Sequence, residues 1–285
     1  MVVVPKRQYG VSTHLYHGQR LSRAHLLEIA RAGFDSIEIF ATRTHFDYEN
    51  PAAVADLQQW LAEAGLTLHG IHAPVVQAYE GGRWIGPLSL ASSDASARTL
   101  AVKETEAALH IARRIPTKFL ITHLGFPRNQ TPEAAPDSRA AARRSIEELH
   151  AAATPLGVQV LVEVIPNELS RATSLVHFVE EDLQGTSVAI CLDFGHAHMD
   201  GDILDAIETV SEHFASTHVH DNGGRTDDHR VPFDGTIDWA SALTAVQKVG
   251  YEGTLLFEVA AHGAPKETLA KAQRARERMN KLLAS

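Results

Sequence analysis

The 285-residue sequence predicts an α/β fold, a single (β/α)8 TIM barrel spanning residues 1–285. Short apolar runs typical of strands alternate with helical patterns, and eight such units fit within the chain. Glycine recurs where a helix gives way to the next strand, as in AGFDSIEI and AGLTLHGI. Strict alternation requires right-handed parallel crossovers, and eight of them match a barrel. An open doubly wound sheet is the alternative, but no G-x-G-x-x-G motif follows an early strand.

The first half of the chain supplies four strand–helix units. Gly33 and Gly65 stand in the usual C-terminal position of the first two helices, and Pro51 begins the second. Strands are expected at residues 9–14, 34–40, 66–72 and 118–123. Helices are expected at residues 22–32, 51–64, 94–114 and 137–153, with a long loop up to residue 93.

The second half repeats this pattern. Strands are expected at residues 158–164, 187–193, 216–220 and 254–259. Helices are expected at residues 175–182, 203–214, 237–249 and 266–283, with a polar loop from 221 to 235.

Composition narrows the class of protein. The formal net charge is −9, so the chain lacks the excess of Lys and Arg that is expected of a general nucleic-acid binder. The single cysteine, Cys191, excludes an intramolecular disulfide and fits a reducing compartment. Met1 to Pro5 is too short an apolar stretch for a signal peptide, and no run of about 18 apolar residues is present. We therefore expect a cytoplasmic protein with no membrane partner.

The stretch Ile190–His198 is the centre of the functional prediction. Asp193 ends a buried apolar run, and His196 follows three residues later. A buried carboxylate beside an imidazole is costly unless something satisfies both. Asp-x-x-His is therefore half of a metal site, or else a hydrogen-bonded Asp–His pair.

Other predicted strands end in the same way. The carboxyl ends of barrel strands share one rim, so these side chains should converge. Their number favours a metal-centred site, because loop-locking hydrogen bonds would account for only one or two of them. The residues are His72, His123, Glu163, Asp193, His196, His218, Asp227, His229 and Glu258.

These motifs resemble the xylose-isomerase-like TIM barrels. The resemblance extends from GVSTH to LLFEV and is most specific in LVEV, CLDFGHAH, HVHDN and DDHRVPFDGTIDW. That superfamily holds sugar and sugar-phosphate isomerases and epimerases, inosose-processing enzymes and endonuclease-IV-type AP endonucleases. The resemblance implies a small sugar, ketose, inosose or sugar phosphate as substrate, and pairing through rim loops as a homo-oligomer.

The isomerase and epimerase branch implies one Mn²⁺, Mg²⁺ or Co²⁺ ion. By motif its ligands are Glu163, Asp193, His218 and Glu258. Glu163 and Glu258 would also be catalytic, moving protons through a metal-stabilised enediolate. His196 and Arg230 would hold substrate oxygens.

The AP-endonuclease branch implies three Zn²⁺ ions and phosphodiester hydrolysis. Its additional ligands match His72, His123, His196, Asp227 and His229. The sequence departs from this branch at Val164–Asn167, where that branch has a short Asn-Thr motif, and the acidic charge argues against nucleic acid. A keto-sugar dehydratase, which shares the enolisation step, and a non-catalytic sugar receptor are further alternatives.

Five further residues are candidate substrate contacts. His220 lies two positions after His218 on the same strand face, and the resemblance favours His218 as the metal ligand. Glu38, Asn167 and Trp84 are expected at the rim or in its loops, with hydrogen bonding or packing of the loops as the alternative for each. His14 is, like Glu38, a candidate substrate contact, with rim hydrogen bonding as the alternative.

Overall fold

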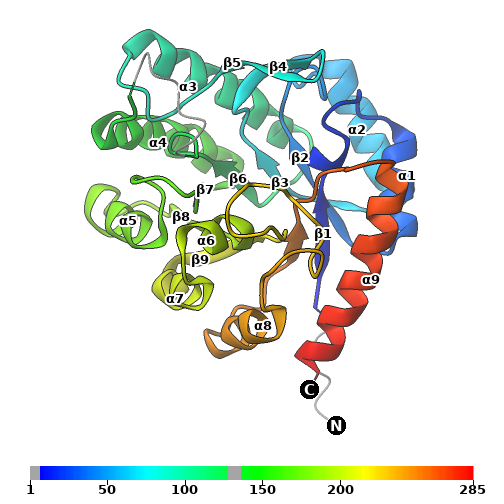
Figure 1. Cartoon of the computed structure of the whole chain (residues 1–285). Coiled ribbons are helices and arrows are strands. Elements are labelled where there is room, and N and C mark those ends of the chain that lie inside the picture. Colours follow the sequence, from blue (N-terminus) through cyan, green and yellow to red (C-terminus); the bar gives the residue numbers. More distant parts are fainter. Residues whose placement is uncertain (1–6, 128–135, 285) are drawn as a thin grey trace.

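A computed structural model describes residues 7–127 and 136–284. Eight parallel strands form one sheet that is rolled into a nearly closed barrel, in the order β10-β1-β2-β3-β6-β7-β8-β9 (Figure 1). The strands are β1 (Tyr9–Ser12), β2 (Ser36–Phe40), β3 (Thr67–His72), β6 (Phe119–Thr122), β7 (Gln159–Glu163), β8 (Ala189–Asp193), β9 (Phe214–His218) and β10 (Leu255–Phe257). The predicted (β/α)8 barrel is confirmed.

The barrel closes between β9 and β10. Val219 and Phe257 form a parallel bridge there. The Val219 N–H donates to the carbonyl of Leu256 at 2.7 Å, and the Glu258 N–H donates to the carbonyl of Val219 at 3.2 Å. These bonds bring the carboxyl ends of β9 and β10, the two edge strands of the sheet, beside each other. The side chains at the carboxyl ends of the strands therefore share one rim.

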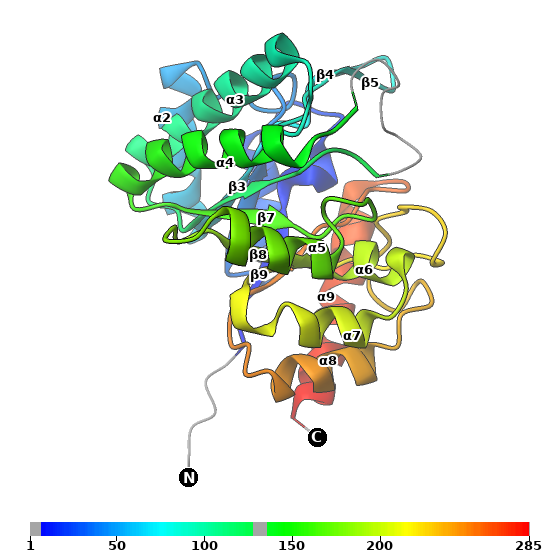
Figure 2. The ribbon, with the colours of Figure 1, turned by 90° about the vertical axis from the view of Figure 1, so that its left-hand side faces the viewer.

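Helices surround the barrel (Figures 1 and 2). Leu26, Ile29 and Leu57 are fully buried in the core between helices and strands. The helices are α1 (Arg23–Arg31), α2 (Pro51–Ala64), α3 (Ala95–Leu109), α4 (Arg139–Ala153), α5 (Ala172–His177), α6 (Phe194–Asp200), α7 (Ile203–Thr209), α8 (Trp239–Lys248) and α9 (Pro265–Leu283). Within residues 7–127 and 136–284, no helix has the length and apolar character to cross a membrane.

The structure corrects two predictions in the first half of the chain. The stretch expected to be a long loop up to residue 93 contains a hairpin, β4 (Val76–Glu80) and β5 (Arg83–Pro87). Most of its side chains are at least partly exposed, so it lacks the buried alternation that identifies a strand. The first strand ends at Ser12, and a 3-10 turn, η1 (Thr13–Tyr16), carries His14.

The second half differs mainly at its helix ends. The helix expected at residues 203–214 ends at Thr209, and β9 begins at Phe214 and ends at His218, so His220 lies beyond the strand. The unpredicted helix α6 begins directly after β8, where the Asp193 carboxylate caps it by accepting from the His196 N–H at 2.7 Å. The predicted Asp-x-x-His pair is therefore also a helix cap.

The Asp221 carboxylate anchors the loop between β9 and α8. Asp221 is fully buried, and its oxygens accept four hydrogen bonds of 2.8–3.2 Å from three backbone N–H groups and one indole. The donors are Asn222, Phe233, Ile237 and the Nε1 of Trp239. Gly235 packs against this carboxylate, since a Cβ there would lie 2.2 Å from Asp221 Oδ1. The anchored loop carries Asp227 and His229.

We predict that Asp221→Ala lowers the free energy of unfolding by about 3 kcal/mol or more, because it leaves buried donors without an acceptor. Asp238→Ala is the matched control, since Asp238 caps α8 at the surface and its loss should cost about 1 kcal/mol. Urea denaturation of both variants in the presence of chelator measures the difference. Equal losses would contradict the anchoring role.

Candidate metal centre

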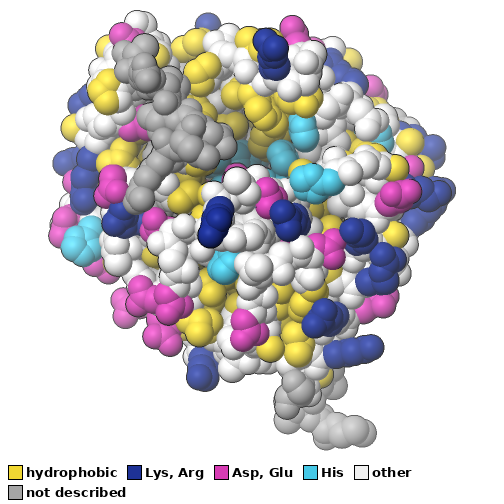
Figure 3. Space-filling model, viewed as in Figure 1, with side chains coloured by type: hydrophobic (Ala, Val, Ile, Leu, Met, Phe, Trp, Pro, Cys, Tyr) yellow, Lys and Arg dark blue, Asp and Glu magenta, His cyan; other side chains and the backbone are white. Residues whose placement is uncertain are grey.

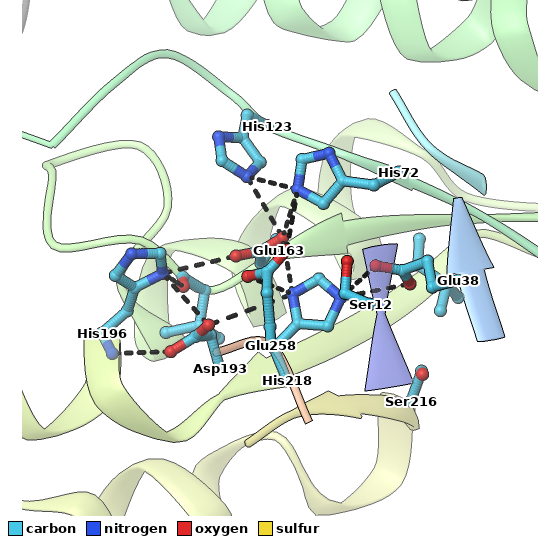
Figure 4. Close-up of polar contacts among 12 residues, drawn as sticks. Ser12, Glu38, His72, His123, Glu163, Asp193, His196, Ser216, His218 and Glu258 are labelled. Atoms are coloured by element: carbon cyan, nitrogen blue, oxygen red, sulfur yellow. Dashed lines mark hydrogen bonds and ion pairs between the residues drawn. The ribbon is translucent and has the colours of Figure 1, made fainter. Parts of the chain in front are cut away.

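Acidic and histidine side chains converge at the carboxyl ends of the strands (Figure 4). Glu163 ends β7, Asp193 ends β8, His218 ends β9 and Glu258 follows β10. All four are at most 3% exposed. His218 Nδ1 lies 3.1 Å from Glu163 Oε2, 3.4 Å from Glu258 Oε2 and 3.9 Å from Asp193 Oδ2. The three carboxylates predicted as ligands of a single metal ion therefore surround Nδ1 of the fourth, His218; we call these four residues the central group.

A second group lies on one side of Glu163. His72 Nε2 and His123 Nε2 are 3.1 Å apart. They lie 3.5 Å and 3.1 Å, respectively, from Glu163 Oε2. The Glu163 carboxylate is thus shared between this group and the central group.

A third group forms around Asp227. His196 Nε2 and His229 Nε2 each lie 3.2 Å from Asp227 Oδ2. His220 is fully buried, with Nε2 at 3.0 Å from Asp193 Oδ1 and 3.8 Å from Asp227 Oδ1. Ligand atoms of His196, His220, Asp227 and His229 all lie within 4.8 Å of one another, so His220, expected to contact substrate, is positioned instead as a candidate ligand.

Three of these histidines are oriented by backbone carbonyls. His72 Nδ1 lies 2.9 Å from the carbonyl of Ala73, His196 Nδ1 lies 3.1 Å from that of Val164, and His229 Nδ1 lies 2.9 Å from that of Glu258. An N–H at Nδ1 that donates to a carbonyl leaves Nε2 of the neutral ring as a lone pair. That pattern is typical of histidines that ligate metal ions.

Unpaired buried atoms test whether a metal ion fits. Among the described residues, Glu163 Oε1, Glu258 Oε1, Asp227 Oδ1 and His218 Nδ1 are buried without a hydrogen-bond partner. Leaving such atoms unsatisfied costs about 1–3 kcal/mol each. A divalent cation would satisfy them, and mixed imidazole and carboxylate ligands suit Zn²⁺ or Mn²⁺. The residues present therefore fit a metal ion.

The charges in the site reinforce one another. Burial opposes ionisation of Glu163, yet His218 and His123 hold the pKa of its carboxyl well below the ordinary value. Burial likewise opposes protonation of His196, but Asp193 and Asp227 raise its pKa well above the ordinary value. Asp227 has the same effect on His229, where it outweighs burial and raises the pKa to about 10. These carboxylates are ionised, and protons on the histidines balance their charge.

A cavity of about 620 Å³ opens over these groups. Figure 3 shows histidine side chains gathered around a hollow on this face. His72, His123, His196, Asp227, His229 and Glu258 line one part of the cavity, and His14, His17, Phe40 and Trp84 line another. Trp84 on β5 is 45% exposed and stacks on His17 with ring centroids 4.9 Å apart. Of the expected substrate contacts, His14, Trp84 and His196 line this cavity.

The structure places the other expected substrate contacts elsewhere. Glu38 is fully buried, with Oε1 3.1 Å from His218 Nε2, on the side of the ring away from the central group. The Asn167 amide donates to the carbonyls of Leu124 and Phe126 and accepts from backbone N–H groups, so it fastens two loops together. Arg230 pairs with Asp228 at 2.8 Å and lines a neighbouring cavity of about 540 Å³.

The sequence analysis did not identify His17 and Phe40 as lining the cavity. Phe40 is the last residue of β2, and His17 follows the turn after β1. Their position at the carboxyl ends of strands is the signal that could have identified them. An aromatic residue there is more often part of the core, so the sequence offered little to separate the two roles.

Comparisons with known proteins agree on the fold. A family model described as "Xylose isomerase-like TIM barrel" matches residues 26–282. An uncharacterized protein of Methanocaldococcus jannaschii is 22% identical over 258 residues, covering 88% of this chain and 83% of that protein. The structure is similar to that of a D-tagatose 3-epimerase-like protein, with a TM-score of 0.77, 20% identity and coverage of 97% and 98% of the two chains. It is also similar to an IOLI protein with a binding zinc atom, with a TM-score of 0.74, 15% identity and the same coverage.

We predict that Glu38→Gln weakens binding of Mn²⁺ or Zn²⁺ to the central group by about 10- to 100-fold, because the uncharged amide no longer fixes the His218 ring and its basicity. Glu28→Gln is the matched control; Glu28 lies on α1 and accepts from the Tyr16 hydroxyl at 3.2 Å. Competition with a chelating dye measures both affinities. Equal affinities in the two variants would refute the positioning role of Glu38.

We also predict that metal binding releases protons at pH 7. His229, with a pKa of about 10, carries a proton in the metal-free protein and must lose it before Nε2 can ligate a metal ion. Affinity at the third group should therefore rise with pH up to about 10. Titration calorimetry in two non-coordinating buffers of different ionisation enthalpy measures the release, and His229→Ala should reduce it. Identical heats in both buffers would contradict the prediction.

Proposed function

We propose that this chain, which belongs to the xylose isomerase-like TIM barrel family, is a divalent-metal-dependent isomerase or epimerase of a small sugar or ketose. The observation that carries the proposal is the central group. The carboxylates of Glu163 and Glu258 lie 3.1 Å and 3.4 Å from His218 Nδ1, and Glu258 also borders the cavity. Two carboxylates at such a site can each take or return a proton on a different part of a bound substrate.

Glu163 and Glu258 would transfer the protons. The depressed pKa of Glu163 keeps its carboxylate ionised at neutral pH, so it can act as the base that removes the proton next to the substrate carbonyl. Glu258, protonated from solvent, would deliver its own proton to the resulting enediolate, either on the opposite face or on the neighbouring carbon, while Glu163 keeps the proton that it removed. A divalent ion held by the central group, when bound, polarises the carbonyl and an adjacent hydroxyl.

The cavity supports a sugar as the substrate. Phe40 and Trp84 supply aromatic surface for C–H groups, and the histidines and carboxylates supply partners for hydroxyls. A volume of about 620 Å³ lies in the range of small-molecule sites. The D-tagatose 3-epimerase-like structure, similar over 97% of this chain, supports the same substrate class.

A second candidate is multi-zinc phosphodiester hydrolysis of the endonuclease IV type. The observation that favours it is the presence of the second and third groups around the central one, with Glu163 shared. Neighbouring metal ions can activate water and stabilise a phosphoryl transition state. A keto-sugar dehydratase would begin with the same proton removal by Glu163 and differ in its product.

We predict that Glu163→Gln and Glu258→Gln each reduce exchange of the proton next to the carbonyl by about 10²- to 10⁴-fold, because each removes an acid–base group. NMR of D-tagatose or D-fructose in D₂O with Mn²⁺ follows the exchange. Glu28→Gln should exchange at the rate of the unmodified protein.

The same preparations separate the two candidates. Exchange that persists in both variants would exclude the isomerase mechanism. Close to three zinc ions per chain, together with chelator-sensitive nicking of abasic duplex DNA and no ketose exchange, would favour the hydrolase instead.

A further inference from the structure

A second cavity, of about 540 Å³, lies beside the one over the candidate metal ligands, and the chemistry above does not use it. It lies between the loop after β9 and the start of α9. Arg230, Val231 and Asp234 line it from the loop, and Thr268 and Lys271 line it from the helix. Its volume is in the range of small-molecule sites. A ketose that occupies the first cavity therefore leaves a second one of similar size next to it.

The two cavities adjoin each other along one short segment of the loop. His229 lines the first cavity, and Arg230, the next residue, lines the second. Asp228, Ala260 and His262 line both cavities. His262 Nε2 lies 2.6 Å from the Asp228 carbonyl, so this contact marks the boundary between them. Consecutive Cα atoms are only about 3.8 Å apart, so a substituent joined to the ketose by a short linkage would reach from one cavity into the other.

The cationic side chains of the second cavity are each paired with a carboxylate. Arg230 lies 2.8 Å from Asp228, and Lys271 lies 2.9 Å from Asp234. The side chains of Arg230 and Lys271 are 45% and 54% exposed, so these pairs are solvated and weak. Each pair presents hydrogen-bond donors beside acceptors. A hydroxyl group both donates and accepts, so it can bond both members of a pair without separating them.

The lining as a whole favours an uncharged group that carries hydroxyls. Besides His262, it holds two cations and three carboxylates, of which Glu267 is the third. A phosphate would have to compete with carboxylates for both cations and would still lie near Glu267. Among the described residues, no aromatic ring other than the His262 imidazole lines this cavity, so an aromatic substituent would lack a stacking partner. A second sugar unit fits these groups best.

We propose that the second cavity binds a second sugar unit, so that the substrate is a ketose that carries a sugar at the end away from its carbonyl. The two ion pairs, Arg230 with Asp228 and Lys271 with Asp234, would hold the hydroxyls of that unit. This inference rests on the proposed function for the ketose itself. Binding is measured without turnover, so the two proposals can fail separately.

The test compares three ligands that differ only at O6 of the ketose: D-fructose, D-fructose 6-phosphate and 6-O-α-D-glucopyranosyl-D-fructose. Titration calorimetry on the Mn²⁺-loaded full chain measures the three affinities. The disaccharide is expected to bind about ten-fold more tightly than D-fructose, because it adds hydrogen bonds to charged groups. The phosphate is expected to bind no more tightly than D-fructose.

A substitution on α9 tests whether the second cavity is the source of this preference. Lys271→Met keeps a side chain of similar length and removes the ammonium group. It should reduce the preference for the disaccharide over D-fructose by about ten-fold. Lys281→Met is the matched control, because Lys281 lies on the same helix outside the cavity lining, and the preference should be that of the unmodified protein.

Each outcome decides the proposal. Equal affinities for the disaccharide and D-fructose, tighter binding of the phosphate than of D-fructose, binding of none of the three, or an unchanged preference in Lys271→Met would overturn the second sugar site. A preference that depends on Lys271, without exchange of the proton next to the carbonyl, would support the site and reject the isomerase reaction. Exchange with D-fructose and no preference for the disaccharide would reject the site and leave the reaction standing.

Discussion

The Glu163 carboxylate is the constraint on which the rest of the site depends. One of its oxygens faces His72 and His123 on one side and His218 on the other, all within 3.5 Å. A buried carboxylate surrounded in this way remains ionised, because the neighbouring imidazoles hold its pKa well below the ordinary value. Because the same carboxylate belongs to two groups, any change at one group alters the electrostatics of the other.

The backbone of the barrel positions the side chains that surround Glu163. The bridge between Val219 and Phe257 closes the sheet and sets Glu258 beside His218. The Asp221 carboxylate then ties the following loop to α8. Gly195 makes room for the third group, because a Cβ there would lie 2.0 Å from the His220 ring. The ligand geometry is thus a consequence of strand closure and two close approaches of backbone to side chain.

The cavity has two chemically different ends. Carboxylates and imidazoles at one end suit a cation and proton transfer, whereas stacked rings at the other suit hydroxyls and C–H groups. The β4–β5 hairpin, carrying Trp84, forms part of the second end. A substrate that spans both ends would be oriented by aromatic contacts while its carbonyl lies near Glu163 and Glu258.

The sequence by itself determined the barrel and the residues at its rim. Apolar runs alternate with helical patterns, and in any parallel barrel the residues that end buried strands converge. Glu163, Asp193, His218 and Glu258 could be found in this way. Tertiary structure decided where the side chains lie: Glu38 beneath His218, His220 among the candidate ligands and Arg230 in a neighbouring cavity. Those outcomes depend on ring orientation and loop anchoring by residues far apart in the chain, which local sequence patterns do not encode.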